Sequence, residues 1–82
     1  MADHPYAKGQ QVEMVSMLNE HLKAKYPEVE QYVWEIGKVV ESYWVGFEDP
    51  NLPKGYYFYH VCIDRGNHTM AVPEEALKHY LG

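Results

Sequence analysis

The stretch GYYFYHVCIDRGNHTMAVPEE, residues 55–75, constrains the fold of this chain more than any other part of it. It predicts a β-hairpin, because residues 56–63 and 68–72 each show the alternation of half-buried strands. A glycine and an asparagine in the intervening segment 64–67 tolerate positive φ and predict a tight turn. Pro73 cannot donate to a strand ladder, so it is expected to end the second strand.

Two segments before the hairpin are expected to complete the sheet. Residues 10–14 alternate apolar and polar side chains and predict a short strand. Residues 32–48, YVWEIGKVVESYWVGFE, are rich in β-branched and aromatic side chains and predict a long strand. We expect that strand to bend at Gly37-Lys38, because a glycine inside a strand pattern marks a bulge or a bend.

One helix is predicted before the long strand and another at the C-terminus. The first spans residues 16–25, with Ser16 as its N-cap and Pro27 disfavouring helical geometry just beyond its end. A competing interpretation starts this helix within residues 10–14, where apolar residues also recur at helical spacing. Residues 73–82 predict a closing helical turn or short helix, because proline suits a first helical position and glutamates suit a first turn.

Four pieces of sequence carry a resemblance at the level of the fold. They are a strand led by Gly9 with Val12 and Met14 inward, GKVV at 37–40, YHVCID at 59–64, and VPEEAL at 72–77. In this order they resemble an SH3-like small barrel, as in β-barrel accessory subunits and Tudor-type modules. The resemblance implies a mainly β fold with α, in which four to five antiparallel strands carry an inserted helix and a short C-terminal helix. The alternative is an α+β architecture with one helix packed on a three-stranded meander.

Size and composition restrict the class of function. The 82 residues predict a flexible N-terminus over residues 1–8 and a single small globular domain over residues 9–82. The net charge of −5 comes from scattered acids, which argues against nucleic acid and membrane as partners. A single cysteine excludes a disulfide within the chain, and no apolar leader segment stands out. We therefore expect a cytoplasmic protein.

Aromatic residues give the strongest functional signal, with eight tyrosines, two tryptophans and two phenylalanines. Many of them flank a proline-containing loop at residues 48–55, which connects the long strand to the hairpin. A strand buries only one side in a core this small, so some of these rings are expected to be exposed or covered by the helix. Exposed tyrosine and tryptophan clusters are typical anchors of protein interfaces. The predicted partner-binding residues are Tyr43, Trp44, Phe47, Tyr56 and Phe58.

Two alternative kinds of site use other residues. An aromatic cage for methylated lysine would need three converging rings and an acid such as Glu48 or Asp49. A small metal- or thiol-dependent enzyme would use His60, Cys62 and His68, with Asp64 as a further ligand. His60 lies about 7 Å from Cys62 along the strand, which makes His68 across the hairpin the better-placed base. The usual paired spacings of zinc ligands are absent.

The sequence therefore predicts a non-enzymatic interaction module. We expect an accessory, regulatory or inhibitory small subunit that docks on a larger protein through its aromatic-rich sheet face. No catalytic residue, bound metal or cofactor is expected, because no matching motif is present. A homodimer formed through an unpaired edge strand is the alternative assembly.

Overall fold

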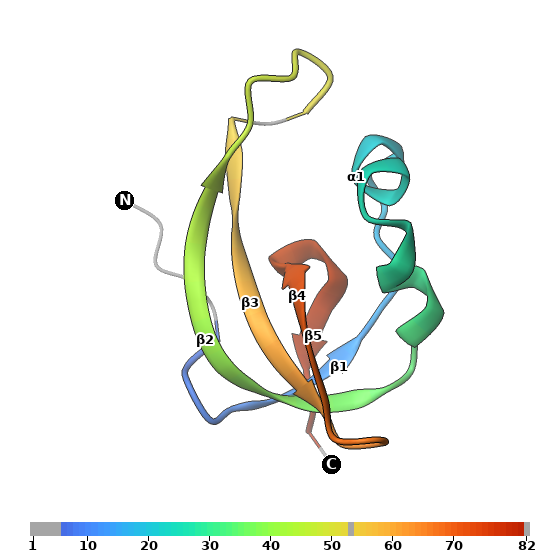
Figure 1. Cartoon of the computed structure of the whole chain (residues 1–82), viewed down its shortest axis with the longest axis vertical. Helices are drawn as coiled ribbons and strands as arrows, with labels where there is room; N and C mark the ends of the chain where they lie inside the picture. Colours follow the sequence, from blue (N-terminus) through green and yellow to red (C-terminus); the bar gives the residue numbers. More distant parts are fainter. Residues whose placement is uncertain (1–5, 53, 82) are drawn as a thin grey trace.

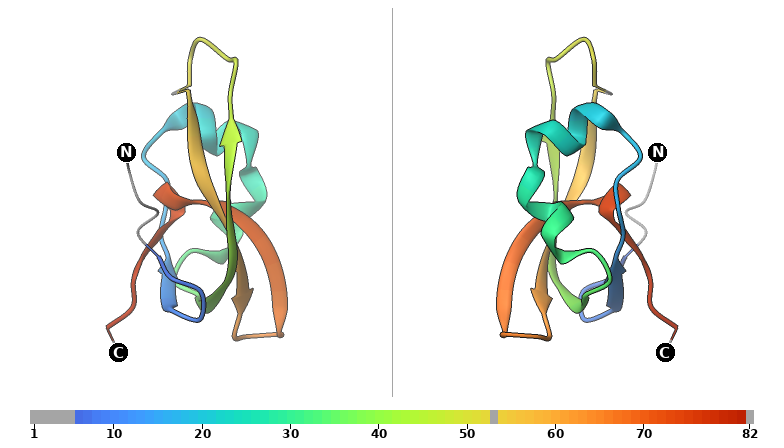
Figure 2. Two further views of the ribbon diagram at one scale, coloured as in Figure 1. Left: turned by 90° about the vertical axis from the view of Figure 1, so that its left-hand side faces the viewer. Right: turned by 90° about the vertical axis from the view of Figure 1, so that its right-hand side faces the viewer.

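The computed structural model describes residues 6–52 and 54–81 and contains one antiparallel sheet of five strands in the order β4-β3-β2-β1-β5. Figure 1 shows β2 and β3 following one long curve, with α1 and the 3₁₀ turn η1 on the opposite side of the molecule. The two views in Figure 2 agree that α1 and η1 cover one side of the sheet. The elements are β1 (Gln11–Met14), α1 (Glu20–Lys25), η1 (Pro27–Tyr32), β2 (Ile36–Gly46), β3 (Gly55–Ile63), β4 (His68–Pro73), η2 (Glu74–Ala76) and β5 (Leu77–His79).

The fold is mainly β with small helical elements, as the sequence predicts. The sheet is coiled but not closed, because its edge strands β4 and β5 pair only with β3 and β1 among the described residues. The hairpin of β3 and β4 is confirmed almost to the residue, with a turn over 64–67 between the two strands.

The long strand β2 connects the two ends of the sheet. Its start pairs with β1, as in Gln11 with Lys38, and the strand pairs with β3 from Gly37 to Gly46. At Gly37 a Cβ atom would lie 2.6 Å from Val61 Cγ1 and 2.7 Å from the Cys62 carbonyl oxygen, so only glycine fits. The irregularity in the ladder lies further along than predicted, between Val39 and Glu41, where a β-bulge shifts the register.

The start of β2 differs from the prediction of a strand over residues 32–48. Residues 27–32 form η1 instead, and the strand begins only at Ile36. Trp34, between the two elements, has a φ of 81°, which is left-handed rather than extended backbone. Trp34 thus lies in the turn that connects η1, which covers one side of the sheet, to β2.

The helix α1 is shorter than predicted, because it begins at Glu20 rather than near Ser16. Asn19 is the N-cap, and its Oδ1 accepts hydrogen bonds from the amides of His21 and Leu22. The Ser16 hydroxyl instead donates to Glu30 of η1 at 2.8 Å. The predicted end of the helix at Lys25 is confirmed.

The predicted C-terminal helix is replaced by the three-residue 3₁₀ turn η2 and the strand β5. Leu77 of β5 pairs with Met14 of β1, and it is buried while Lys78 and His79 are exposed. This pairing engages backbone groups along the otherwise open edge of β1. A short helix would have left that edge without a partner.

The core lies inside the curve of the sheet. Val12 and Met14 point inward as predicted, and Tyr59, Val61 and Ile63 share the buried face of β3. Helical elements and the ends of the chain contribute the rest. The buried cluster comprises Tyr6, Val12, Met14, Met17, Leu22, Val29, Val39, Tyr59, Val61, Ile63, Val72, Ala76 and Leu77.

The predicted loose end over residues 1–8 falls mostly outside the described residues. Tyr6 is buried, and its hydroxyl donates a hydrogen bond to the Leu77 carbonyl oxygen at 2.9 Å. Across residues 6–52 and 54–81, no helix is long and apolar enough to cross a membrane.

Two carboxylates fasten the connection between β1 and β2 that carries α1 and η1. Glu30 of η1 accepts from the Ser16 hydroxyl and the Met17 amide. Glu75 of η2 accepts from the amides of Leu18 and Asn19, both at 2.7 Å. These bonds join the N-terminal side of α1 to both η1 and η2, which fixes η1 relative to the sheet.

Candidate functional site

Trp44 is the most prominent of the predicted partner-binding residues, with 56% of its surface exposed. Its indole lies over Gly55, because a Cβ atom at Gly55 would come within 2.5 Å of Trp44 Cζ2. The ring also packs edge-on against Tyr57, with 5.2 Å between the ring centroids. A ring resting on a glycine of the neighbouring strand is held in place while much of its surface faces water.

Tyr43, the neighbour of Trp44 in β2, points to the other side of the sheet, since successive side chains of a strand alternate. Its ring is 37% exposed and contacts His60 at 5.1 Å and Phe58 at 6.2 Å between centroids. The predicted aromatic residues are therefore divided between two faces of β2 and β3 rather than gathered on one.

The remaining predicted residues are less exposed, and of these Phe58 contacts Tyr43. Phe58 is buried, with only 2% of its surface exposed, and Phe47 and Tyr56 are half-buried. Phe58 packs against Tyr26 of the loop after α1 at 5.1 Å and against Phe47 at 6.3 Å. The interpretation that the helical segment covers every ring holds for Phe58 but not for Tyr43 or Trp44.

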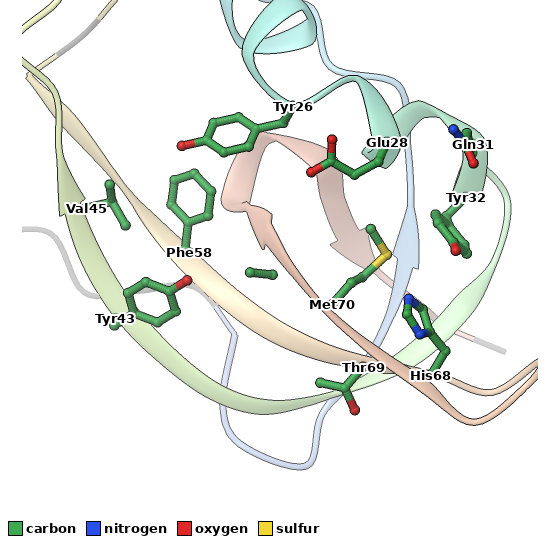
Figure 3. Close-up of a pocket in the computed structure, with 11 residues that line it drawn as sticks. Tyr26, Glu28, Gln31, Tyr32, Tyr43, Val45, Phe58, His68, Thr69 and Met70 are labelled. Carbon is green, nitrogen blue, oxygen red and sulfur yellow. The ribbon is translucent and has the colours of Figure 1, made fainter.

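A groove of about 370 Å³ lies between η1 and the strands β2, β3 and β4 (Figure 3). Figure 3 shows Tyr26, Tyr43 and Phe58 together at one end of it, and Tyr32 beside His68 at the other. Tyr32 and His68 stack there with 5.7 Å between their ring centroids. The lining residues are Tyr26, Glu28, Gln31, Tyr32, Tyr43, Val45, Phe58, His68, Thr69, Met70 and Ala71.

Sequence reasoning missed Tyr26, Tyr32 and Met70 as parts of this groove. Tyr26 directly follows the helix predicted over residues 16–25, and Tyr32 begins the strand predicted over residues 32–48. Their position depends on the way η1 turns back over the sheet, and no local pattern signals that turn.

The groove carries little charge. Among the described residues that line the groove, Glu28 is the only one with a formal charge at neutral pH when histidine is neutral. Burial, with smaller effects of Tyr43 and Glu28, raises the pKa of Tyr26, so its hydroxyl is protonated at neutral pH. Outside the groove, Lys25 Nζ lies 5.8 Å from the centre of the Phe47 ring.

The residues of the thiol or metal alternative are not brought together. Cys62 pairs across the hairpin with Thr69, whereas His68 pairs with Ile63, so thiol and imidazole leave opposite faces of the sheet. The Cys62 thiol lies 3.4 Å from Asn67 Oδ1, and His60 contacts Tyr43. In the described part of the chain, no three His, Cys, Asp or Glu side chains are grouped to hold a metal.

The acids proposed for an aromatic cage also lie elsewhere. Glu48 and Asp49 are exposed in the loop between β2 and β3, where Asp49 accepts a hydrogen bond from the Asn51 amide at 2.8 Å. Neither lines the groove, and Glu28 is the carboxylate that does.

Comparison with known proteins finds no matching family model, no matching curated sequence and no matching solved structure. What this chain does must therefore be inferred from its own residues.

Proposed function

We propose that this chain is a non-enzymatic protein-interaction module, an accessory, regulatory or inhibitory subunit that docks on a larger protein. It binds through its aromatic surface, in which Tyr43 and Trp44 are exposed on opposite faces of β2, Phe47 and Tyr56 are half-buried, and the buried Phe58 supports Tyr43 from within. The observation that carries the proposal is the half-exposed indole of Trp44, seated on Gly55. Tryptophan and tyrosine in fixed positions are the commonest energetic anchors of protein interfaces.

The position of Trp44 supports docking at the end of the hairpin formed by β2 and β3. β1 pairs with β2 only up to Lys38, and β4 pairs with β3 only from Phe58 onward. The segment that contains Trp44 is therefore a two-stranded ribbon that extends beyond the rest of the sheet (Figure 1). A partner that encloses the end of this ribbon would contact Tyr43 on one face and Trp44 on the other.

Rigid rings favour binding for two physical reasons. Each aromatic side chain buries about 150–250 Å² of surface when it is fully covered. A ring already held by Gly55 and Tyr57 loses less conformational freedom on binding than a mobile side chain does.

The SH3-like small barrel remains our proposal for the fold family. The strand order β4-β3-β2-β1-β5 and the 3₁₀ turn between β4 and β5 support it. The fold does not by itself imply a function.

The decisive experiment is affinity recovery of the tagged protein from its native lysate, followed by mass spectrometry. Wild-type protein is compared with Trp44→Ala, and circular dichroism confirms that the variant is folded. Trp34→Ala is the matched control, because Trp34 is 74% exposed and lies outside the aromatic surface. We expect one larger protein with wild type and Trp34→Ala but not with Trp44→Ala. Equal recovery by Trp44→Ala would rule out this surface.

A narrower function, a reader of methylated lysine, is supported by one observation. Tyr26, Tyr43 and Phe58 meet at one end of the groove, whose lining includes the Glu28 carboxylate. Aromatic faces and a carboxylate are what a quaternary ammonium group binds. Saturable binding of a trimethyl-lysine peptide that is lost in Tyr43→Ala would select this function, and equal binding of the unmethylated peptide would reject it.

A further inference from the structure

The groove includes four consecutive residues of β4, namely His68, Thr69, Met70 and Ala71. Side chains of a strand alternate between its two faces, so a surface on one face would include only every second residue. A groove that takes in four residues in a row follows the edge of the strand. β4 is an edge strand of the sheet.

The hydrogen-bond pattern shows which backbone groups point outward from this edge. The Asp64 amide donates to the Ile36 carbonyl oxygen at 2.9 Å, so even-numbered residues of β3 bond to β2. Odd-numbered residues of β3 therefore bond to β4. Thr69 and Ala71 are paired with even-numbered residues, Cys62 and His60, and so direct their N–H and C=O groups away from the sheet.

Two further observations agree with this assignment. Pro73 follows Thr69 and Ala71 at the same two-residue spacing, so its nitrogen also points away from β3. A proline suits this position because it has no N–H group to donate to the neighbouring strand. Within residues 6–52 and 54–81, the backbone groups of Thr69 and Ala71 make no hydrogen bond to a loop, turn or cap. The edge thus offers two donors and two acceptors beside the groove.

The charge around the groove indicates what can pair with this edge. The one formal charge that the described residues bring to the groove is the Glu28 carboxylate, and the whole chain has a net charge of −5. Tyrosine rings line both ends of the groove, and aromatic faces attract the guanidinium and ammonium groups of arginine and lysine. A basic segment is therefore the best electrostatic match.

We propose that β4 accepts an extended, basic segment of the partner protein as an additional strand of the sheet. Its backbone bonds to Thr69 and Ala71, and its alternate side chains enter the groove between β4 and η1. Strand addition of this kind gives affinity through the main chain and specificity through pockets for alternate side chains. The inference rests on the proposed function, since it names the part of the partner that is bound.

The test uses a blocked peptide of alternating valine and arginine, and hydrogen exchange of the whole protein followed by NMR. At a peptide concentration about ten times the Kd, exchange of the Thr69 and Ala71 amides should slow about tenfold, because only unbound protein exchanges. A matching peptide with glutamate in place of arginine should bind at least about tenfold more weakly. Equal binding of the two peptides would overturn the choice of a basic partner.

Two changes remove the backbone contact itself. Thr69→Pro deletes an outward N–H and leaves the ladder to β3 intact, and proline is tolerated in edge strands. We expect about tenfold weaker peptide binding in this variant, with folding checked by circular dichroism. Two peptides, one N-methylated at its valines and the other at its arginines, give the same test without altering the protein, because one of the two series must face β4. Undiminished binding of both peptides would overturn strand addition.

The remaining outcomes separate this inference from the proposed function. A peptide that shifts resonances of Tyr43 or Trp44 but leaves both amides unprotected overturns strand addition and leaves the aromatic surface intact. Amide protection that appears on raising protein concentration without peptide shows a second copy on the edge, which overturns the choice of a partner segment. Amide protection by the peptide, together with full partner recovery by Trp44→Ala, supports strand addition and rules out the aromatic surface as the docking site.

Discussion

Removal of the Glu75 carboxylate should loosen the connection that carries η1 and one wall of the groove. Glu75 Oε2 accepts two amide hydrogen bonds at 2.7 Å, from Leu18 and Asn19, and Oε1 accepts from the Tyr56 hydroxyl at 3.2 Å. Hydrogen bonds to a charged group contribute about 1.5–3 kcal/mol each when they are shielded from water. Leu18 is 88% exposed, so the freed amides can be hydrated and the total loss is smaller than the sum over the three bonds.

We therefore expect Glu75→Ala to lower the free energy of unfolding by about 2–3 kcal/mol, and Glu75→Gln by about 1 kcal/mol because its amide oxygen still accepts. Such a loss is a large share of the stability of a small domain. Urea unfolding followed by circular dichroism measures the change, and hydrogen exchange should show faster exchange at Leu18 and Asn19. Glu74→Ala, one residue away in η2, is the matched control. If Glu75→Ala stays within about 0.5 kcal/mol of that control, the carboxylate does not fasten the connection.

Three further predictions concern close packing and burial. Gly37→Ala should destabilise the protein by about 1–3 kcal/mol in urea unfolding, because its methyl group meets the Cys62 carbonyl oxygen, and an effect no larger than that of Gly46→Ala, whose methyl group makes only ordinary contacts, would contradict this. Gly55→Ala should displace the Trp44 indole and change its near-ultraviolet circular dichroism, whereas an unchanged spectrum would show that the ring does not rest there. Burial raises the pKa of Tyr59 from 10.0 to about 12. The protonated hydroxyl therefore adds up to about 3 kcal/mol to the free energy of unfolding below pH 10, and this stabilisation is lost as the pH rises to about 12. Tyr59→Phe should flatten this alkaline loss in unfolding measured across that range, and an unchanged slope would assign the loss to other groups.

The sequence predicted the parts of the fold that depend on neighbouring residues. The strands β3 and β4 and their turn follow from alternation and a glycine, which act within a few residues. The start of α1 was predicted wrongly, because the local cap is Asn19 rather than Ser16. The contacts of Glu75 with the amides of Leu18 and Asn19 could not be predicted, since they come from the far end of the chain. β5 likewise depends on the open edge of β1, which local sequence does not describe.

The candidate site, too, could be predicted only where it depends on residues close together in the sequence. Aromatic density around the loop pointed to Tyr43 and Trp44, whose exposure the structure shows. The burial of Phe58 follows from its contact with Tyr26, which lies on a segment remote in sequence. The groove itself exists only because η1 folds back over the sheet, so its tyrosines could not be grouped in advance.

The position of Trp44 on Gly55 also means that binding at the proposed docking surface can be followed by tryptophan fluorescence. The chain has two tryptophans, and Trp34 is exposed at a different place in the fold. In a Trp34→Phe variant, all indole fluorescence would come from Trp44. Indole emission moves to shorter wavelength when water is displaced from the ring. Binding of a partner over Trp44 would therefore shift the emission maximum of this variant, and no added dye is needed to detect it.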